Sequence, residues 1–282
     1  MKNLIVPTDF STGSKNAALY AIELAKVLNV TNIILFHAFQ PAPSAIIEAG
    51  NTPFPMVEVE TVSNISHSLL QQFKLELQAH CPENISLQAI DDFSSVNDGI
   101  NEICNKTPVE VIVMGITGTS KIEEVLIGST AISVMKNTRV PVIIVPEAAR
   151  YAPVKNIMFA CDYKKIVETT PVAFIKSILS VTKARLQIVN VSEGKKDALP
   201  DKAEQQELLR SIFGGYEVFF HFIDDTEFIT GVNNFVDANN VDMIITVPKK
   251  HSFFEGLFKE KHTKKLAFHS RVPIVCVHQE DL

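Results

Sequence analysis

Three things that the sequence lacks exclude whole classes of protein. No apolar run reaches the roughly 18 residues of a membrane helix, and the chain opens on a strand-like stretch without a basic segment. We therefore expect neither a membrane span nor a secretory signal. The four cysteines form no C-x-x-C pair, so the sequence indicates neither a zinc knuckle nor a disulfide framework, and a reducing, cytoplasmic setting fits best.

A basic excess is also missing. The net charge is −6, and residues 1–150 hold 9 Lys and Arg against 15 Asp and Glu, while residues 151–282 hold 17 against 17. Neither half has the surplus typical of a general nucleic-acid binder, so we expect no nucleic-acid partner. The G-x-S-x-G and G-x-x-x-x-G-K-[ST] motifs are absent as well, and we assign no catalytic residue.

What the sequence does contain is an internal repeat. The segment KNLIVPTD at 2–9 reappears as KNIMFACD at 155–162, an offset of 153. Later the offset is 132, since VEVIV at 109–113 matches VDMII at 241–245, and RVPVI at 139–143 matches RVPIV at 271–275. The repeat predicts two domains, residues 1–147 and 153–282, joined by a linker from Glu147 to Pro153.

The second copy is 21 residues shorter in its middle, as the two offsets show. The extra part of the first copy falls at Gln40–Met56, which contains four prolines and a glycine. Such a segment is expected to be a loop, either a plain surface excursion or a lid or partner contact.

Short apolar runs alternate with helical periodicity within each copy. A helix is expected that begins near Ser11 or Ser14, either of which could cap it. Its apolar face comprises Ala17, Tyr20, Ala21, Leu24, Ala25 and Leu28. Strands are expected at Leu4–Val6, Ile33–Phe36, Ile85–Ile90, Val109–Met114 and Val142–Val145. Nearly continuous apolar runs suit strands that helices cover on both faces. The prediction is an α/β protein with two tandem, open, doubly wound, parallel five-stranded sheets, whose ligands bind at the carboxyl ends of the strands.

A glycine loop follows the fourth strand of the first copy. It reads G-x2-G-x9-G-S, with glycines at 115, 118 and 128. Glycines permit positive φ and remove the Cβ that would hold a phosphate away, so backbone N–H groups can converge on an anion. Ser129 and Thr130 would add hydroxyl donors at a helix start. The alternative is a tight turn that needs glycine for backbone reasons alone.

Asp9 ends the first strand and is expected to lie beside this loop. Its carboxylate could accept hydrogen bonds from ribose hydroxyls or a base. It could also cap the helix after Ser11, and both roles are compatible.

These motifs resemble those of tandem universal stress proteins of the UspA-like group. The resemblance rests on V-P-T-D-F-S at the first strand, V-M-G with the glycine loop after the fourth, and V-P-V-I-I-V-P at the fifth. It implies a Rossmann-like fold similar to that of the adenine nucleotide α hydrolases, and ATP, with or without Mg²⁺, bound by the first copy. The implied nucleotide contacts are Pro7, Thr8, Asp9, Ala38, Met114, Gly115, Gly118, Gly128, Ser129 and Thr130.

The resemblance also implies an assembly. The two halves are expected to pack as a pseudo-dimer, with contact at the fifth strands, Val142–Val145 and Ile274–Val277, and chains are expected to pair further into homodimers.

The second copy differs at the loop positions. An offset of 132 places Val247, Lys250, Glu260 and Lys261 where the first copy has Gly115, Gly118, Gly128 and Ser129. Side chains there would fill the cradle and a carboxylate would repel phosphate, so no ATP is expected in this copy. The nearby lysines either attract an acidic ligand or form the solvated face of a helix.

Two other groups of residues are weaker candidates. His251, His262 and His269 lack a recognisable metal spacing. The pairs Asp91-Asp92 and Asp224-Asp225 could hold Mg²⁺ or simply begin a turn. Three hypotheses stay open: a regulatory ATP-binding stress-response protein with at most slow hydrolysis, a nucleotide-independent scaffold, and an ATPase or nucleotidyl-transferring enzyme.

Overall fold

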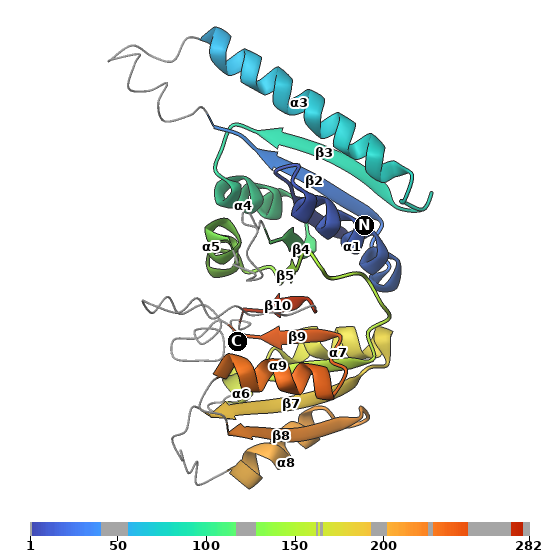
Figure 1. The fold of residues 1–282 in the computed structure, drawn as a ribbon, viewed down its shortest axis with the longest axis vertical. Helices are drawn as coiled ribbons and strands as arrows, with labels where there is room; N and C mark the ends of the chain where they lie inside the picture. Colours follow the sequence, from blue (N-terminus) through green and yellow to red (C-terminus); the bar gives the residue numbers. More distant parts are fainter. Residues whose placement is uncertain are drawn as a thin grey trace, which may run out of the picture.

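The chain alternates between strands and helices (Figure 1). The structure, a computed structural model, describes residues 2–40, 56–116, 128–161, 163, 166–192, 202–224, 228–247 and 272–278. The elements of the first half are β1 (Asn3–Pro7), α1 (Thr12–Leu28), β2 (Asn32–Ala38), α3 (Met56–Gln78), β3 (Ser86–Asp92), α4 (Val96–Lys106), β4 (Val109–Gly115), α5 (Ser129–Asn137) and β5 (Val142–Val145). Those of the second half are β6 (Asn156–Ala160), α6 (Ile166–Thr169), α7 (Val172–Thr182), β7 (Arg185–Ser192), α8 (Lys202–Ile212), β8 (Val218–Asp224), α9 (Phe228–Ala238), β9 (Met243–Thr246) and β10 (Ile274–Cys276).

All the described strands belong to one ten-stranded sheet, in the order β3-β2-β1-β4-β5-β10-β9-β6-β7-β8. Each half supplies five strands in the same relative order, and the strands succeed one another along the long axis of the molecule (Figure 1). Pairing is parallel within each half, which confirms the α/β class and the doubly wound order.

The two halves meet through antiparallel pairing of β5 with β10. Ile274 lies opposite Ile144, and Cys276 lies opposite Val142. The expected contact between the fifth strands is therefore confirmed. It joins the two predicted five-stranded sheets into one.

The central strands are apolar because helices cover both of their faces. Every residue of β1 and of β5 is buried. Four of the five strand ranges expected from the sequence lie inside observed strands, and Ile85 precedes β3 by one residue. The continuous apolar runs thus marked the buried strands correctly.

The hydrophobic core is continuous across the junction on one face of the sheet only. On that face a single cluster extends from Leu4 in β1 to Val277 beyond β10, and α1 contacts α7. On the other face the described residues form two clusters, one beneath α4 and α5 and one beneath α9. Cys276 of the second half packs into the cluster of the first half, so the junction is buried on both faces.

Local signals set the ends of the helices. Ser11 caps α1, because its Oγ accepts a hydrogen bond from the Ser14 N–H at 3.2 Å, and Asn29 ends the helix in the left-handed region at φ 53°. The corresponding helix of the second half is split into α6 and α7. Pro171 stands between them, and it lacks the N–H that a continuous helix requires.

The segment predicted as a linker is fixed onto α1. Asn16 donates hydrogen bonds to the carbonyl oxygens of Pro146, at 3.1 Å, and Ala149, at 2.9 Å. Arg150 donates to the Asn16 side-chain oxygen at 2.9 Å, and the ring of Tyr151 packs edge-on against Tyr20. The connection between the halves is therefore part of the packed structure.

Several expectations can be compared with the described residues. None of the helices they form has the length and apolar character that a membrane crossing needs, and no two cysteines form a disulfide. Most of the proline-rich loop lies outside the described residues, which resume at Met56 with α3.

The register at the junction of the halves can be tested by cross-linking. Val142 and Cys276 are opposite one another and face the same side of the sheet, so Val142→Cys is expected to form a disulfide with Cys276 under mild oxidation. Ile143→Cys is the matched control, because Ile143 faces the other side of the sheet. Peptide mass spectrometry of the monomer checks the linkage. Equal cross-linking of Cys276 by both variants would contradict this register.

Candidate functional site

The strand order reverses between β1 and β4, where an open doubly wound sheet places its ligand. Pro7, Ala38 and Gly115 each end one of the adjacent strands β1, β2 and β4. The sheet therefore brings these three predicted site residues to the same edge.

Three predicted residues share one face of this edge. Met114 belongs to the cluster beneath α4 and α5, and Ala38 packs against that cluster. Pro7 is two residues beyond Ile5, which lies in the same cluster, so strand alternation places it on the same face. Together they form an apolar floor at the carboxyl ends of the strands.

Thr8 holds the turn that follows β1. It is 7% exposed, its N–H donates to the Phe36 carbonyl oxygen at 2.8 Å, and its Oγ1 accepts from the Phe10 N–H at 3.0 Å. The same hydroxyl lies 3.0 Å from Ser14 Oγ. The Thr8 hydroxyl is thus engaged in shaping the turn.

His37 supports this turn from β2, and the sequence analysis missed it. Its Nδ1 lies 2.7 Å from the Thr8 carbonyl oxygen. Because a carbonyl oxygen can only accept, Nδ1 carries a proton and donates it. The available signal was a polar ring at the end of an otherwise apolar strand.

Phe10 adopts a left-handed backbone conformation, with φ 63°. This conformation costs a non-glycine residue roughly 1–3 kcal/mol. Contacts of its ring offset part of the cost: the centroid lies 4.5 Å from that of His37 and 5.8 Å from that of Phe73.

Asp9 presents its carboxylate to solvent between these ordered residues. Its Oδ1 accepts a hydrogen bond from the Ser11 N–H at 3.1 Å. Partial burial raises the pKa of the Asp9 carboxyl, but hydrogen bonds from Ser11 and Ser14 outweigh this effect and lower the pKa overall. The carboxylate is therefore ionised at neutral pH, so both of its oxygens act only as hydrogen-bond acceptors.

Gly115 and Gly13 allow two backbones to touch. A Cβ on Gly115 would lie 2.3 Å from the Gly13 carbonyl oxygen, and a Cβ on Gly13 would lie 2.5 Å from the Ile116 carbonyl oxygen. The start of α1 thus rests directly on the end of β4. The backbone explanation considered for Gly115 is supported by this contact, and Gly13 was not foreseen because the contact depends on tertiary packing.

The start of α5 lacks a capping side chain. Gly128 is the N-cap residue and makes no side-chain cap hydrogen bond, whereas Ser11 caps α1 and Ser95 caps α4. Ser129 and Thr130 are exposed. Since α5 runs back from β4 to β5, its amino terminus lies on the side of the strands' carboxyl ends. Gly118, the remaining predicted contact, lies outside the described residues.

The second half repeats the turn after its first strand. The Cys161 N–H donates to the Val189 carbonyl oxygen at 2.9 Å, Asn190 Nδ2 donates to the Cys161 carbonyl oxygen at 2.9 Å, and Tyr163 has φ 54°. The two hydrogen bonds match those of Thr8 and His37, and the left-handed conformation of Tyr163 matches that of Phe10. An offset of 153 relates the two sets.

The touching glycines are not repeated. Ile166 and Val247 stand at the positions of Gly13 and Gly115, and both are buried in the cluster on the α1 and α7 face. Large side chains therefore occupy the place where two backbones meet in the first half. Lys250, Glu260 and Lys261 lie outside the described residues.

The acidic pair of the first half lies within β3. Asp91 Oδ1 is 3.0 Å from His67 Nδ1 of α3, so this carboxylate ties the helix to the strand. Among the described residues, no group of three or more His, Cys, Asp or Glu side chains could hold a metal ion. His251, His262, His269 and Asp225 fall outside that part of the chain.

The contact between the two glycines predicts an unusual cost for a single methyl group. Gly115→Ala is expected to lower the free energy of unfolding by about 1–3 kcal/mol, because the new Cβ would overlap the Gly13 carbonyl. Gly214→Ala is the control, since its nearest neighbour would be the Ser211 carbonyl oxygen at 3.3 Å. Urea denaturation compares them, and equal stability of the two variants would contradict the contact.

Comparison with known proteins gives consistent results. The profile of the universal stress protein family matches residues 1–146. A universal stress protein of Methanocaldococcus jannaschii is 29% identical over 149 residues, which cover 51% of this chain and 81% of that protein.

Solved structures resemble the whole chain. A universal stress protein from Archaeoglobus fulgidus aligns with a TM-score of 0.72 and 18% identity over 98% of both chains. A protein from Pseudomonas aeruginosa described as a putative universal stress protein aligns with a TM-score of 0.59 and 11% identity, over 99% of this chain and 93% of that one. At these identities the structures establish the fold alone, and the family match establishes membership: the chain belongs to the universal stress protein family.

Proposed function

We propose that the first half binds ATP at the carboxyl ends of β1, β2 and β4, and that the chain is a regulatory protein whose partner binding or stability responds to the nucleotide. The observation that carries the proposal is that the uncapped start of α5 and the exposed Asp9 carboxylate both lie on the side of the sheet where the strands end. A helix start that can bind the phosphates and a carboxylate that can accept from the ribose hydroxyls thus accompany an apolar floor for the base.

The phosphates are assigned to the start of α5 and the glycine loop. Unpaired N–H groups and the positive end of the helix dipole favour an anion there. Gly128 leaves those groups without a competing side chain, and Ser129 and Thr130 are exposed beside them. Gly118 remains part of this proposed cradle.

The ribose is assigned to Asp9 and the base to the apolar floor. Asp9 accepts from the Ser11 N–H through Oδ1, and its exposed carboxylate is assigned to a ribose hydroxyl. The floor of Pro7, Ala38 and Met114 offers the apolar contact that a base needs. Thr8 contributes through its backbone and its place in the turn, since its hydroxyl is engaged.

We propose that ATP is confined to the first half of a tandem of two domains, residues 1–147 and 153–282. The repeated turns at Thr8 and Cys161 support the tandem arrangement. Ile166 and Val247 bring β-branched side chains to the positions of the touching glycines. In the second half the helix that begins at Ile166 therefore cannot approach the end of β9 as closely as α1 approaches β4.

We propose no catalytic activity for this chain beyond slow hydrolysis of ATP. Phosphoryl transfer requires groups that stabilise charge on the transferred phosphate. None of the proposed contact residues is a lysine or an arginine, and the described residues hold no group of three or more side chains that could bind a metal ion. Magnesium would accompany the nucleotide through its phosphates.

Homodimer formation and a cytoplasmic location are retained as proposals. The resemblance placed the contact between halves at the fifth strands, and β5 and β10 already pair with each other within one chain. A dimer of two chains therefore needs another surface. Sedimentation equilibrium over a range of concentrations tests it, and a single species of monomer mass would oppose it.

Gly128→Asp separates binding from folding. Aspartate is a preferred N-cap residue, so the variant should retain or increase the melting temperature, but its charge should repel the phosphates and weaken ATP binding by about tenfold or more. Gly128→Ser adds a cap that competes for the same N–H groups but carries no charge, so it should weaken ATP binding less than Gly128→Asp does. Isothermal titration with ATP measures the affinity and the stoichiometry, which should be one ATP per chain.

Asp9→Asn supplies an independent test of the ribose contact. The lowered Asp9 pKa keeps the carboxylate ionised above about pH 5, so wild-type affinity should not change through titration of Asp9 between roughly pH 5 and pH 8. The amide variant should bind more weakly throughout. Wild-type protein without measurable affinity at millimolar ATP would refute the proposal and favour the nucleotide-independent scaffold.

A further inference from the structure

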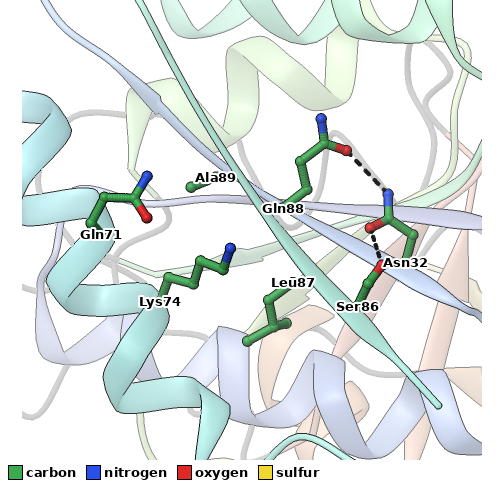
Figure 2. Close-up of a pocket in the computed structure, with 7 residues that line it drawn as sticks. All are labelled: Asn32, Gln71, Lys74, Ser86, Leu87, Gln88 and Ala89. Carbon is green, nitrogen blue, oxygen red and sulfur yellow. Dashed lines mark hydrogen bonds between the residues drawn. The ribbon is translucent and has the colours of Figure 1, made fainter. Parts of the chain in front are cut away.

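A polar groove lies between α3 and the outer edge of β3 (Figure 2). It encloses about 440 Å³ and is lined by Asn32, Gln71, Lys74, Ser86, Leu87, Gln88 and Ala89. Asn32 and Ser86 are the first residues of β2 and β3, so the groove extends from the end of these strands opposite the proposed nucleotide site. We propose that this groove binds an extended, acidic peptide segment of a partner protein, which adds to the sheet as a strand beside β3.

The edge of β3 presents backbone groups in the pattern that such a strand needs. At one end of β3 the Ser86 N–H donates to the Thr31 carbonyl oxygen at 3.0 Å, and at the other the Asp92 carbonyl oxygen accepts from Phe39 at 3.0 Å. Even-numbered residues therefore point their backbone groups toward β2. By alternation, the N–H and C=O of Leu87 and Ala89 point outward, where no described strand pairs with them.

β3 lacks two of the devices that protect an exposed edge, although its last two residues carry carboxylates and α3 lies along the outer end of the sheet (Figure 1). Its sequence, SLQAIDD, contains neither proline nor lysine. Its pairing with β2 continues in register from Ser86 to Asp92, without a bulge that would bend the strand away. An unbulged edge is the receptor in peptide recognition by strand addition, and here Gln88 is exposed and Ala89 half-buried, while Leu87 is 6% exposed.

Side chains around the edge favour a polar, acidic segment. Gln71 and Lys74 extend from α3 toward β3 (Figure 2). Among the described residues no carboxylate pairs with Lys74, so its ammonium can receive an acidic side chain. The wall of the groove across from α3 is formed by Asn32, Ser86 and Gln88 (Figure 2). Asn32 is 8% exposed, its side-chain oxygen accepts from Ser86 Oγ at 2.7 Å, and its Nδ2 lies 3.4 Å from Gln88 Oε1.

The shape of the groove favours a single segment over a second copy of the chain. Neighbouring strands are about 4.8 Å apart, whereas packed helices need about 8–10 Å between their axes. α3 contacts β3 and forms one wall of the groove, and it lies along the outer end of the sheet (Figure 1). A second copy of the chain would have to bring its own α3 to the same place, whereas a single peptide strand brings no helix.

The test begins with a display library of short random peptides selected against the full-length chain. Selected peptides should be enriched in acidic residues, and their affinities are measured by fluorescence polarisation. Ala89→Pro removes an outward N–H, and Lys74→Glu reverses the charge of the one ionisable side chain that lines the groove, so each variant should weaken binding by about tenfold or more. Ala89→Ser and Lys74→Arg keep the N–H and the charge, and both should retain binding.

A second measurement locates the peptide. Hydrogen exchange of the Leu87 and Ala89 amides should slow when a selected peptide binds, while a Lys74→Glu chain should show no such protection. If Ala89→Pro fails to fold, as judged by circular dichroism, the Lys74 variants and the exchange data still decide. Failure to select any peptide above background, equal binding by Lys74→Glu, or protection confined to other strands would each overturn the proposal.

Discussion

The backbone of α1 rests on the backbone at the end of β4, with no side chain between them. This contact needs glycine at both Gly13 and Gly115, since a Cβ on either residue would overlap the other segment. It fixes the start of α1 close to the sheet. The turn that carries Asp9 is then held between β1 and α1 by Thr8, Ser11 and Ser14. The position of the exposed carboxylate therefore follows from the absence of two side chains.

The two halves share a framework and differ at this contact. Both use a side-chain N–H at the end of the second strand to hold the carbonyl that precedes the acidic position, through His37 in one half and Asn190 in the other. Only the first half has the paired glycines and an unbroken helix after the turn. In the second half Ile166 and Val247 enter the core, and Pro171 divides the helix. The proposed difference in ATP binding between the halves thus has a structural basis within a common sheet.

The fold was largely predictable because apolar runs mark strands that are buried on both faces, and the repeated segments implied the same strand order twice. The pairing of β5 with β10 could be anticipated only through the family resemblance. The roles of Gly13, His37 and Arg150 could not be predicted, because each depends on a contact between segments distant in sequence. The division of α6 from α7 follows from Pro171, which lacks the N–H that a continuous helix requires. For the candidate site, the sequence identified Pro7, Ala38 and Gly115, which the sheet brings to one edge, while the uncapped start of α5 required the structure.

The central claim is that an adenine nucleotide enters the first half and is excluded from the second. Photoaffinity labelling with azido-ATP, followed by peptide mass spectrometry, tests it directly. The account predicts label on peptides from residues 1–147, and competition by unlabelled ATP. Label that competes with ATP but lies on peptides from residues 153–282 would contradict it.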